Sequence, residues 1–166
     1  SMTYEYARKY VIIGVDPGEM TGLFRSIYTE VNGNVVSVNL GYQFDRNEVM
    51  QALNTQVTEW SKLFGPENVH VAVERYIITK RTASLSQQPA AMEITGAVKG
   101  FAELAGVEVK QYLKANLKYA NDDMLRRMGW YKKGHRHAND AARQASALLK
   151  EIDYPRWCEL VKSGTL

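Results

Sequence analysis

The sequence has a single cysteine, Cys158, and no apolar run that approaches the length of a membrane-spanning helix. One thiol excludes an internal disulfide and a thiolate metal cluster, and it fits a reducing, cytoplasmic setting. The polar N-terminal residues predict no signal peptide, and Ser1-Met2 resembles the remnant of a cleaved tag. We found neither an internal repeat nor a low-complexity segment. These absences favour a globular protein that does not associate with a membrane.

Basic residues are in only small excess, with a net charge of +3, but the charge is unevenly distributed along the chain. Residues 75–143 hold thirteen Lys and Arg against six Asp and Glu, whereas residues 1–74 hold five against nine. A basic middle segment on a nearly neutral chain indicates a side that faces a polyanion. An ordinary solvated basic surface is the alternative interpretation, and charge alone does not separate the two.

A chain of 166 residues is long enough for one domain with a sizeable core. We expect a single domain over residues 1–166, with a flexible start at 1–9 and a C-terminal tail at 153–166. The pattern predicts three consecutive strands, of which the second and third are joined at Asn32-Gly33, a strong signal for a tight hairpin. Alternating helices and strands follow, which predicts an α/β fold with a mixed five-stranded sheet and helices on both faces. The expected strands are 11–15, 22–31, 35–42, 69–74 and 107–113, and the expected helices are 47–64, 89–105, 121–128 and 138–152.

The first expected strand ends in a carboxylate, Asp16. Val11 to Val15 is a short run rich in β-branched residues, typical of a strand buried on both faces, and Asp16-Pro17-Gly18 follows it directly. An ionised aspartate at the end of a buried strand is costly to desolvate unless a cation or several donors receive it. Asp16 therefore indicates a metal site or an ATPase phosphate site, with a simple turn as the plain alternative.

Three further residues can join Asp16 in a metal site. A second buried strand ends in Glu74, and in a mixed sheet the ends of two such strands can lie side by side. His137 and Asp140 are three residues apart, so both side chains lie on one face near the start of the last helix. These four ligands predict a site for two Mg²⁺ or Mn²⁺ ions that hydrolyses phosphodiesters. Taken singly, Glu74 can equally pair with Arg75 or Arg81, and His137 can cap its helix.

Val-Asp16-Pro-Gly, Val-Glu74 at a strand end and His137-Ala-Asn-Asp140-Ala-Ala, in that order, resemble the RuvC family of Holliday-junction resolvases. The resemblance spans residues 10–149 and implies the RNase H-like fold of that superfamily. It implies a homodimer that binds a four-way DNA junction and nicks two opposed strands with Mg²⁺ or Mn²⁺. Asp16, Glu74, His137 and Asp140 match the catalytic set, although many members carry a carboxylate where His137 stands. The short chain resembles phage-borne members, which implies the cytoplasm of a bacterium or of a phage-infected host.

The resemblance also gives a role to the loop after Glu74, which in the family approaches the junction crossover. Tyr76 or Ile77 would stack on or wedge an unpaired base, while Lys80 and Arg81 would neutralise phosphates. Burial of the apolar residues in the core is the alternative. Further basic residues are candidates for contacts with the DNA backbone, and each is also explained as an ordinary surface charge. They are Lys114, Lys118, Arg126, Arg127, Lys132, Lys133 and Arg136.

Three other functions fit parts of the pattern. The first is the same fold and metal chemistry acting on flapped or otherwise branched DNA or on an RNA–DNA hybrid. The second is a sugar-kinase or actin-like ATPase, which is disfavoured because the chain has no second Asp-x-Gly. The third is a module that binds branched DNA without cutting it. Dimerisation and a nicking test separate them from the junction resolvase.

Overall fold

The computed structural model describes residues 6–76 and 88–163. Its five-stranded sheet has the order β3-β2-β1-β4-β5. The strands are β1 (Tyr6–Asp16), β2 (Thr21–Val31), β3 (Asn34–Phe44), β4 (Val69–Arg75) and β5 (Glu108–Leu113). The first three strands pair antiparallel, and β4 and β5 join them in parallel, so the sheet is mixed as predicted.

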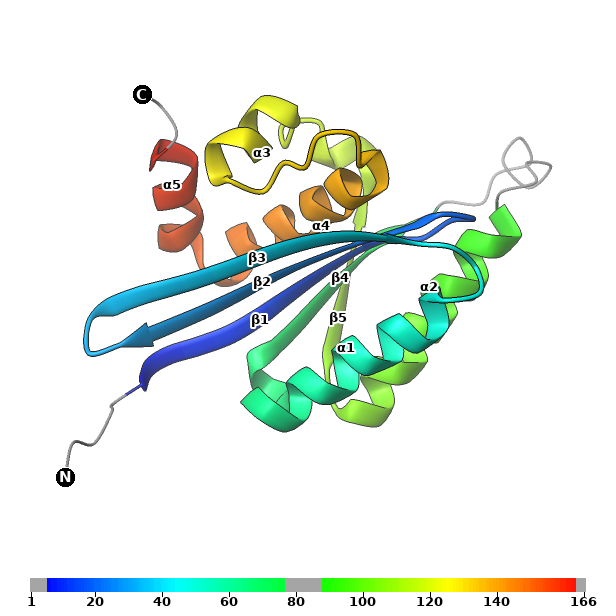
Figure 1. Ribbon diagram of the computed structural model, residues 1–166, viewed down its shortest axis with the longest axis horizontal. Helices are drawn as coiled ribbons and strands as arrows, with labels where there is room; N and C mark the ends of the chain where they lie inside the picture. The colour runs from blue at the N-terminus through cyan, green and yellow to red at the C-terminus, as the bar shows by residue number, and fades with distance from the viewer. Residues whose placement is uncertain (1–5, 77–87, 164–166) are drawn as a thin grey trace.

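Helices cover both faces of the sheet (Figure 1). The helices α1 (Val49–Phe64) and α2 (Gln88–Ala105) lie on one face, while α3 (Asp122–Met128), α4 (Arg136–Ile152) and α5 (Tyr154–Ser163) lie on the other. Two short 3₁₀ turns complete the order, η1 (Pro66–Asn68) before β4 and η2 (Lys114–Leu117) after β5. No helix in these described ranges is long and apolar enough to cross a membrane.

The alternation of β1 divides the core in two. Val11, Ile13 and Val15 are fully buried against the side of α1 and α2, whereas Tyr10 and Ile12 pack on the side of α4. Successive side chains of a strand point to opposite faces, so Asp16 continues the row of Tyr10 and Ile12. The alternation of side chains along β1 therefore points the carboxylate of Asp16 toward α4.

The predicted hairpin is confirmed, because Asn32 and Gly33 both take positive φ angles, 50° and 79°, between β2 and β3. The strand β3 forms an edge of the sheet and is mostly exposed, unlike β1, β2 and β4. It carries no charged side chain over its whole length.

Two expectations about the ends of the chain were wrong. Residues 6–9, expected to be flexible, belong to β1, where Arg8 pairs with Glu30 of β2. The expected C-terminal tail contains α5, which packs on α3 and α4. Pro155 is the second residue of α5, and proline is well tolerated in the first turn of a helix because the N–H it lacks would have no partner there.

Candidate active site

Asp16 and Glu74 end neighbouring parallel strands. Val15 of β1 pairs with Val73 of β4, so the two carboxylates occupy the next position of the same register. Both residues are only 8% exposed. Two acidic groups buried side by side repel one another, and that arrangement is costly unless protons or cations reduce the charge.

The helix α4 approaches these carboxylates because two glycines leave room for its backbone. A Cβ atom on Gly14 of β1 would overlap the carbonyl oxygen of Ala141, and one on Gly22 of β2 would overlap that of His137. Glycine inside a strand often marks such a close approach. These contacts set α4 directly on β1 and β2, with His137 and Asp140 above the end of β1.

A side chain of β3 caps the start of α4. His135 is at the N-cap position and makes no capping hydrogen bond with its side chain. The Gln43 Oε1 atom instead accepts hydrogen bonds from the backbone N–H groups of His137, at 2.9 Å, and Ala138, at 3.3 Å. The first N–H groups of a helix need partners outside it, so Gln43 fixes the helix end that carries His137. The alternative role of His137 as the cap does not apply.

The buried amide of Asn139 holds the basic loop that precedes α4. Its Oδ1 atom accepts a hydrogen bond from the N–H of Lys132 at 2.8 Å, and its Nδ2 atom donates to the carbonyl oxygen of Lys132 at 2.9 Å. Asn139 is 4% exposed, so both bonds are shielded from water. Asn139, directly before the candidate ligand Asp140, therefore fixes the loop of Lys132 and Lys133.

His137 meets Asp16 directly, with Nδ1 of the imidazole 3.2 Å from Oδ2 of the carboxyl group. Burial, followed by the nearby charges of Asp140 and Glu74, raises the pKa of Asp16 to about 8. Burial and the charge of Arg136 lower the pKa of His137. Near neutral pH a largely protonated carboxyl group therefore faces a neutral imidazole.

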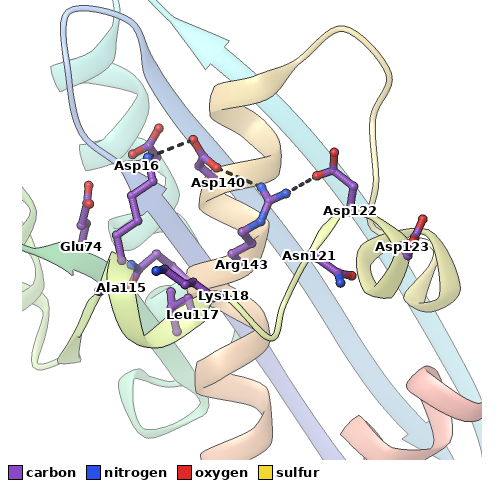
Figure 2. Close-up of a pocket in the computed structure, with 12 residues that line it drawn as sticks. Asp16, Glu74, Ala115, Leu117, Lys118, Asn121, Asp122, Asp123, Asp140 and Arg143 are labelled. Atoms are coloured by element: carbon purple, nitrogen blue, oxygen red, sulfur yellow. Dashed lines mark hydrogen bonds and ion pairs between the residues drawn. The ribbon is translucent and has the colours of Figure 1, made fainter.

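Asp140 is surrounded by cations (Figure 2). Its Oδ1 atom lies 2.9 Å from Arg143, and its Oδ2 atom lies 3.6 Å from Nζ of Lys114. Arg143 also pairs with Asp122, so it connects α4 to the first turn of α3. Among the residues described, no group of three or more His, Cys, Asp and Glu side chains is arranged as it stands to hold a metal ion. The ion pairs of Asp140 give a physical reason, because they turn its carboxylate toward Arg143 and Lys114.

The chemistry of the four side chains nevertheless suits a divalent cation. Asp16, Glu74, His137 and Asp140 line one cleft and offer carboxylate oxygens and one imidazole, which Mg²⁺ and Mn²⁺ accept. Burial is the main cause of the raised pKa of Asp16, and the negative charges of Asp140 and Glu74 add to it. A bound cation would favour the ionised form of all three carboxylates.

The basic and aromatic candidates are spread around this cleft. Tyr76 forms part of its wall and donates a hydrogen bond to the carbonyl oxygen of Pro17 at 3.1 Å. Burial and the neighbouring Glu74 raise the pKa of its phenol. Ile77, Lys80 and Arg81 lie outside the described residues. The other cations are exposed, and three of them, Lys114, Lys118 and Arg136, line the hollows beside the carboxylates.

The remaining four cations do not line these two hollows: Lys132, Lys133, Arg126 and Arg127. The Lys132 Nζ atom donates a hydrogen bond to the carbonyl oxygen of Gly41 at 3.0 Å, and Arg126 stacks over the ring of Tyr131. Because Arg126 already has a partner within the chain, it partly fits the alternative interpretation, in which it is an ordinary surface charge.

Four polar residues of the site were not found by sequence reasoning: Gln43, Asn139, Arg143 and Gln144. Arg143 follows Asp140 by three residues, a spacing that predicts contact on one helix face. The hydrogen-bond partners of Gln43 and Asn139 lie outside the elements that carry these two residues, so no local sequence pattern predicts the contacts.

Comparison with solved structures identifies the fold. The RuvC of Thermus thermophilus superposes with a TM-score of 0.58 and 25% sequence identity, over 86% of this chain and 96% of that chain. The same protein in complex with a Holliday junction substrate gives a TM-score of 0.51 and 23% identity, over 87% and 96% of the two chains. This chain has the RuvC fold. No protein-family model and no curated protein matches it. The RNase H-like α/β class predicted from the sequence is confirmed.

Proposed function

We propose that this protein is a metal-dependent endonuclease that nicks four-way DNA junctions. The observation that carries the proposal is the meeting of Asp16, Glu74, His137 and Asp140 at one cleft of a RuvC fold. A similar RuvC is known in complex with a Holliday junction substrate, which supports branched DNA as the ligand.

The four side chains would hold two Mg²⁺ or Mn²⁺ ions. Such ions supply a nucleophilic hydroxide and stabilise the leaving oxygen of a phosphodiester. The protein's own contribution is positional, because the cap at Gln43 and the close packing on Gly14 and Gly22 fix α4 against the sheet. Lys114 and Lys118, exposed beside the carboxylates, would bind the phosphates that flank the cleavage site.

We also propose that the protein acts as a homodimer. One line of α2 has residues four apart, Met92, Gly96, Gly100 and Leu104. Gly100 is half-buried and the other three are exposed, Leu104 to 90%. A Cβ atom on either glycine would meet nothing within 4 Å, so packing inside this chain does not explain them. Glycines spaced by four allow two helices to approach closely. Ala90 of the same helix is buried within this chain, so it does not belong to this line.

The test is nicking of a synthetic four-way junction by the purified protein with Mg²⁺ or Mn²⁺. Linear duplex, a flap and an RNA–DNA hybrid are tested in parallel, and Asp16→Asn is the inactive control. We expect paired, symmetrical nicks on the junction alone, lost in Asp16→Asn. Equal cutting of flaps or hybrids would contradict junction selectivity, and tight binding without cutting would indicate a binding module.

A further inference from the structure

A second, larger cleft adjoins the carboxylates on the side of β5 and α3. Its volume is about 670 Å³, and it shares Asp16, Glu74 and Asp140 with the candidate active site. Ala115 and Leu117 give it an apolar wall, as Figure 2 shows. The cleft is large enough for a nucleotide, and whatever occupies it lies next to the reacting phosphate.

The cleft contains a buried hydrogen-bond acceptor without a partner. Gln144 of α4 lines the cleft and is only 3% exposed. Its Nε2 atom donates to the backbone carbonyl oxygen of Tyr112 at 3.1 Å, which fixes the orientation of the amide because a carbonyl can only accept. Its Oε1 atom is buried and makes no hydrogen bond. An unsatisfied buried oxygen is unfavourable, and a ligand that brings an N–H donor would relieve it.

These features together define the chemistry of the occupant. It needs a flat, largely apolar body to lie against Ala115 and Leu117, and an N–H donor at its edge for Gln144. It needs a phosphate within reach of the cation of Lys118, which lines the same cleft. A nucleobase attached to its backbone phosphate meets all three requirements.

We propose that this cleft binds one unstacked nucleobase of the DNA substrate, with a base N–H group donating to Gln144 Oε1. The inference rests on the proposed nuclease function and deepens it. Extrusion of a base is least costly where stacking or pairing is already weakened, as at a branch point. Gln144 Nε2 already donates to Tyr112, so the free Oε1 is the group that a base N–H can meet, and each of the four DNA bases carries such an N–H. Gln144 is therefore a residue that would stabilise the unstacked base in the cleft.

The experiment replaces each nucleotide beside the nick in turn with an abasic residue, in an otherwise unchanged four-way junction. For the natural protein, we expect one position at which kcat/KM falls roughly five- to tenfold, the value of one buried hydrogen bond with its contacts. In Gln144→Leu, the intact junction should lose a similar factor, and the abasic residue should add little. Gln51→Leu, the same change on the exposed face of α1, is the matched control and should behave as the natural protein.

A nearly equal abasic penalty in Gln144→Leu and the natural protein, or no penalty at any position, would overturn the proposal. Thermal unfolding checks that Gln144→Leu is folded.

A second measurement leaves Gln144 unchanged. The fluorescent base 2-aminopurine is placed at each position of a junction bound to Asp16→Asn. Brightening on binding at one position supports an unstacked base, and unchanged emission at every position excludes one.

The two proposals fail separately. If the natural protein does not nick the intact junction, the nuclease function fails, and the 2-aminopurine signal still decides whether a base is extruded. If it nicks the junction without base dependence, the nuclease function stands and the base site is wrong. If it neither nicks nor binds the junction, both proposals are wrong.

Discussion

His137 Nδ1 and Asp16 Oδ2 lie 3.2 Å apart, although 121 positions separate the two residues in the sequence. Burial is the main cause of both of their pKa shifts, and it favours the neutral form of each group. The contact is therefore a hydrogen bond between a carboxyl group and a neutral imidazole near pH 7. Because this bond depends on the protonation of Asp16, the stability of the site depends on pH.

We predict that the metal-free protein loses stability as pH rises from about 4 to about 8 through the titration of Asp16. Its pKa is 3.8 for the free side chain and about 8 in the folded protein, so the folded state holds a proton that the unfolded state releases. This stabilisation is complete below pH 4 and is lost as pH rises through 8, with a total on the order of several kcal/mol.

Urea unfolding at several pH values, with and without Asp16→Asn, measures this effect. The variant should show a flatter decline over the same range. Glu59→Gln, at a carboxylate on α1 that is 58% exposed, should leave the pH dependence unchanged. Equal pH dependence in Asp16→Asn and the natural protein would show that Asp16 is ionised throughout.

We predict that Gly22→Ala is strongly destabilising, because the new Cβ atom would overlap the carbonyl oxygen of His137. Overpacking against backbone typically costs about 1–3 kcal/mol, and more where the backbone cannot move. Gly41→Ala is the matched control, because the atom nearest to its Cβ would be the Ala138 Cβ, at 3.4 Å. Thermal unfolding should separate the two variants clearly. Similar melting temperatures would show that α4 is free to shift on the sheet.

The sequence indicated Asp16 and Glu74 because each follows a buried strand, and strand parity then fixes which face they point to. His137 and Asp140 were recognisable from their spacing on one helix. What could not be derived was how closely α4 sits on the sheet. Gly14 was the available signal, since glycine is unusual within a run of β-branched residues, whereas Gly22 lies near the start of its strand and gives no such signal.

The polar contacts that hold the site were beyond sequence reasoning for a different reason. Gln43 reaches α4 across 94 positions, and Gln144 reaches a backbone oxygen of β5. A glutamine has no periodicity that reveals such a partner, so only the packed structure shows it. The helix α5 was missed because residues 153–166 were expected to form a C-terminal tail, although Pro155 suits the first turn of a helix.

We predict that Gln43→Leu lowers both stability and nicking. The change removes the acceptor for two N–H groups at the start of α4, and loss of a helix cap costs about 1 kcal/mol. Because His137 lies in that first turn, we expect kcat to fall several-fold with little change in KM. Gln51→Leu on the surface of α1 is the control. A larger effect on KM than on kcat would indicate that Gln43 contacts DNA instead.

We predict that Lys133→Ala weakens junction binding and reduces its salt dependence. Lys133 is exposed on the loop that Asn139 holds in place. Each phosphate contact contributes about 0.9 to the slope of log K against log salt for duplex DNA. The slope should therefore fall by about one unit in Lys133→Ala, and Lys133→Arg should retain it. An unchanged slope would make Lys133 an ordinary surface charge.

We predict that Gly100→Leu separates the proposed dimer without unfolding the protein. A side chain at this position has open space within its own chain, and leucine favours a helix over glycine by up to about 1 kcal/mol. The monomer should therefore be equally or more stable, while the added bulk keeps two α2 helices apart. Sedimentation velocity should show that the dissociation constant of the dimer is raised tenfold or more in Gly100→Leu and is unchanged in Gln51→Leu.

Nicking provides the second measurement of the dimer, since two active sites are needed for paired cuts. Single nicks should replace paired ones in Gly100→Leu at concentrations where the natural protein is dimeric. If Gly100→Leu dimerises as the natural protein does, the two glycines of α2 have no role in assembly. The exposed edge strand β3 would then be the next surface to test.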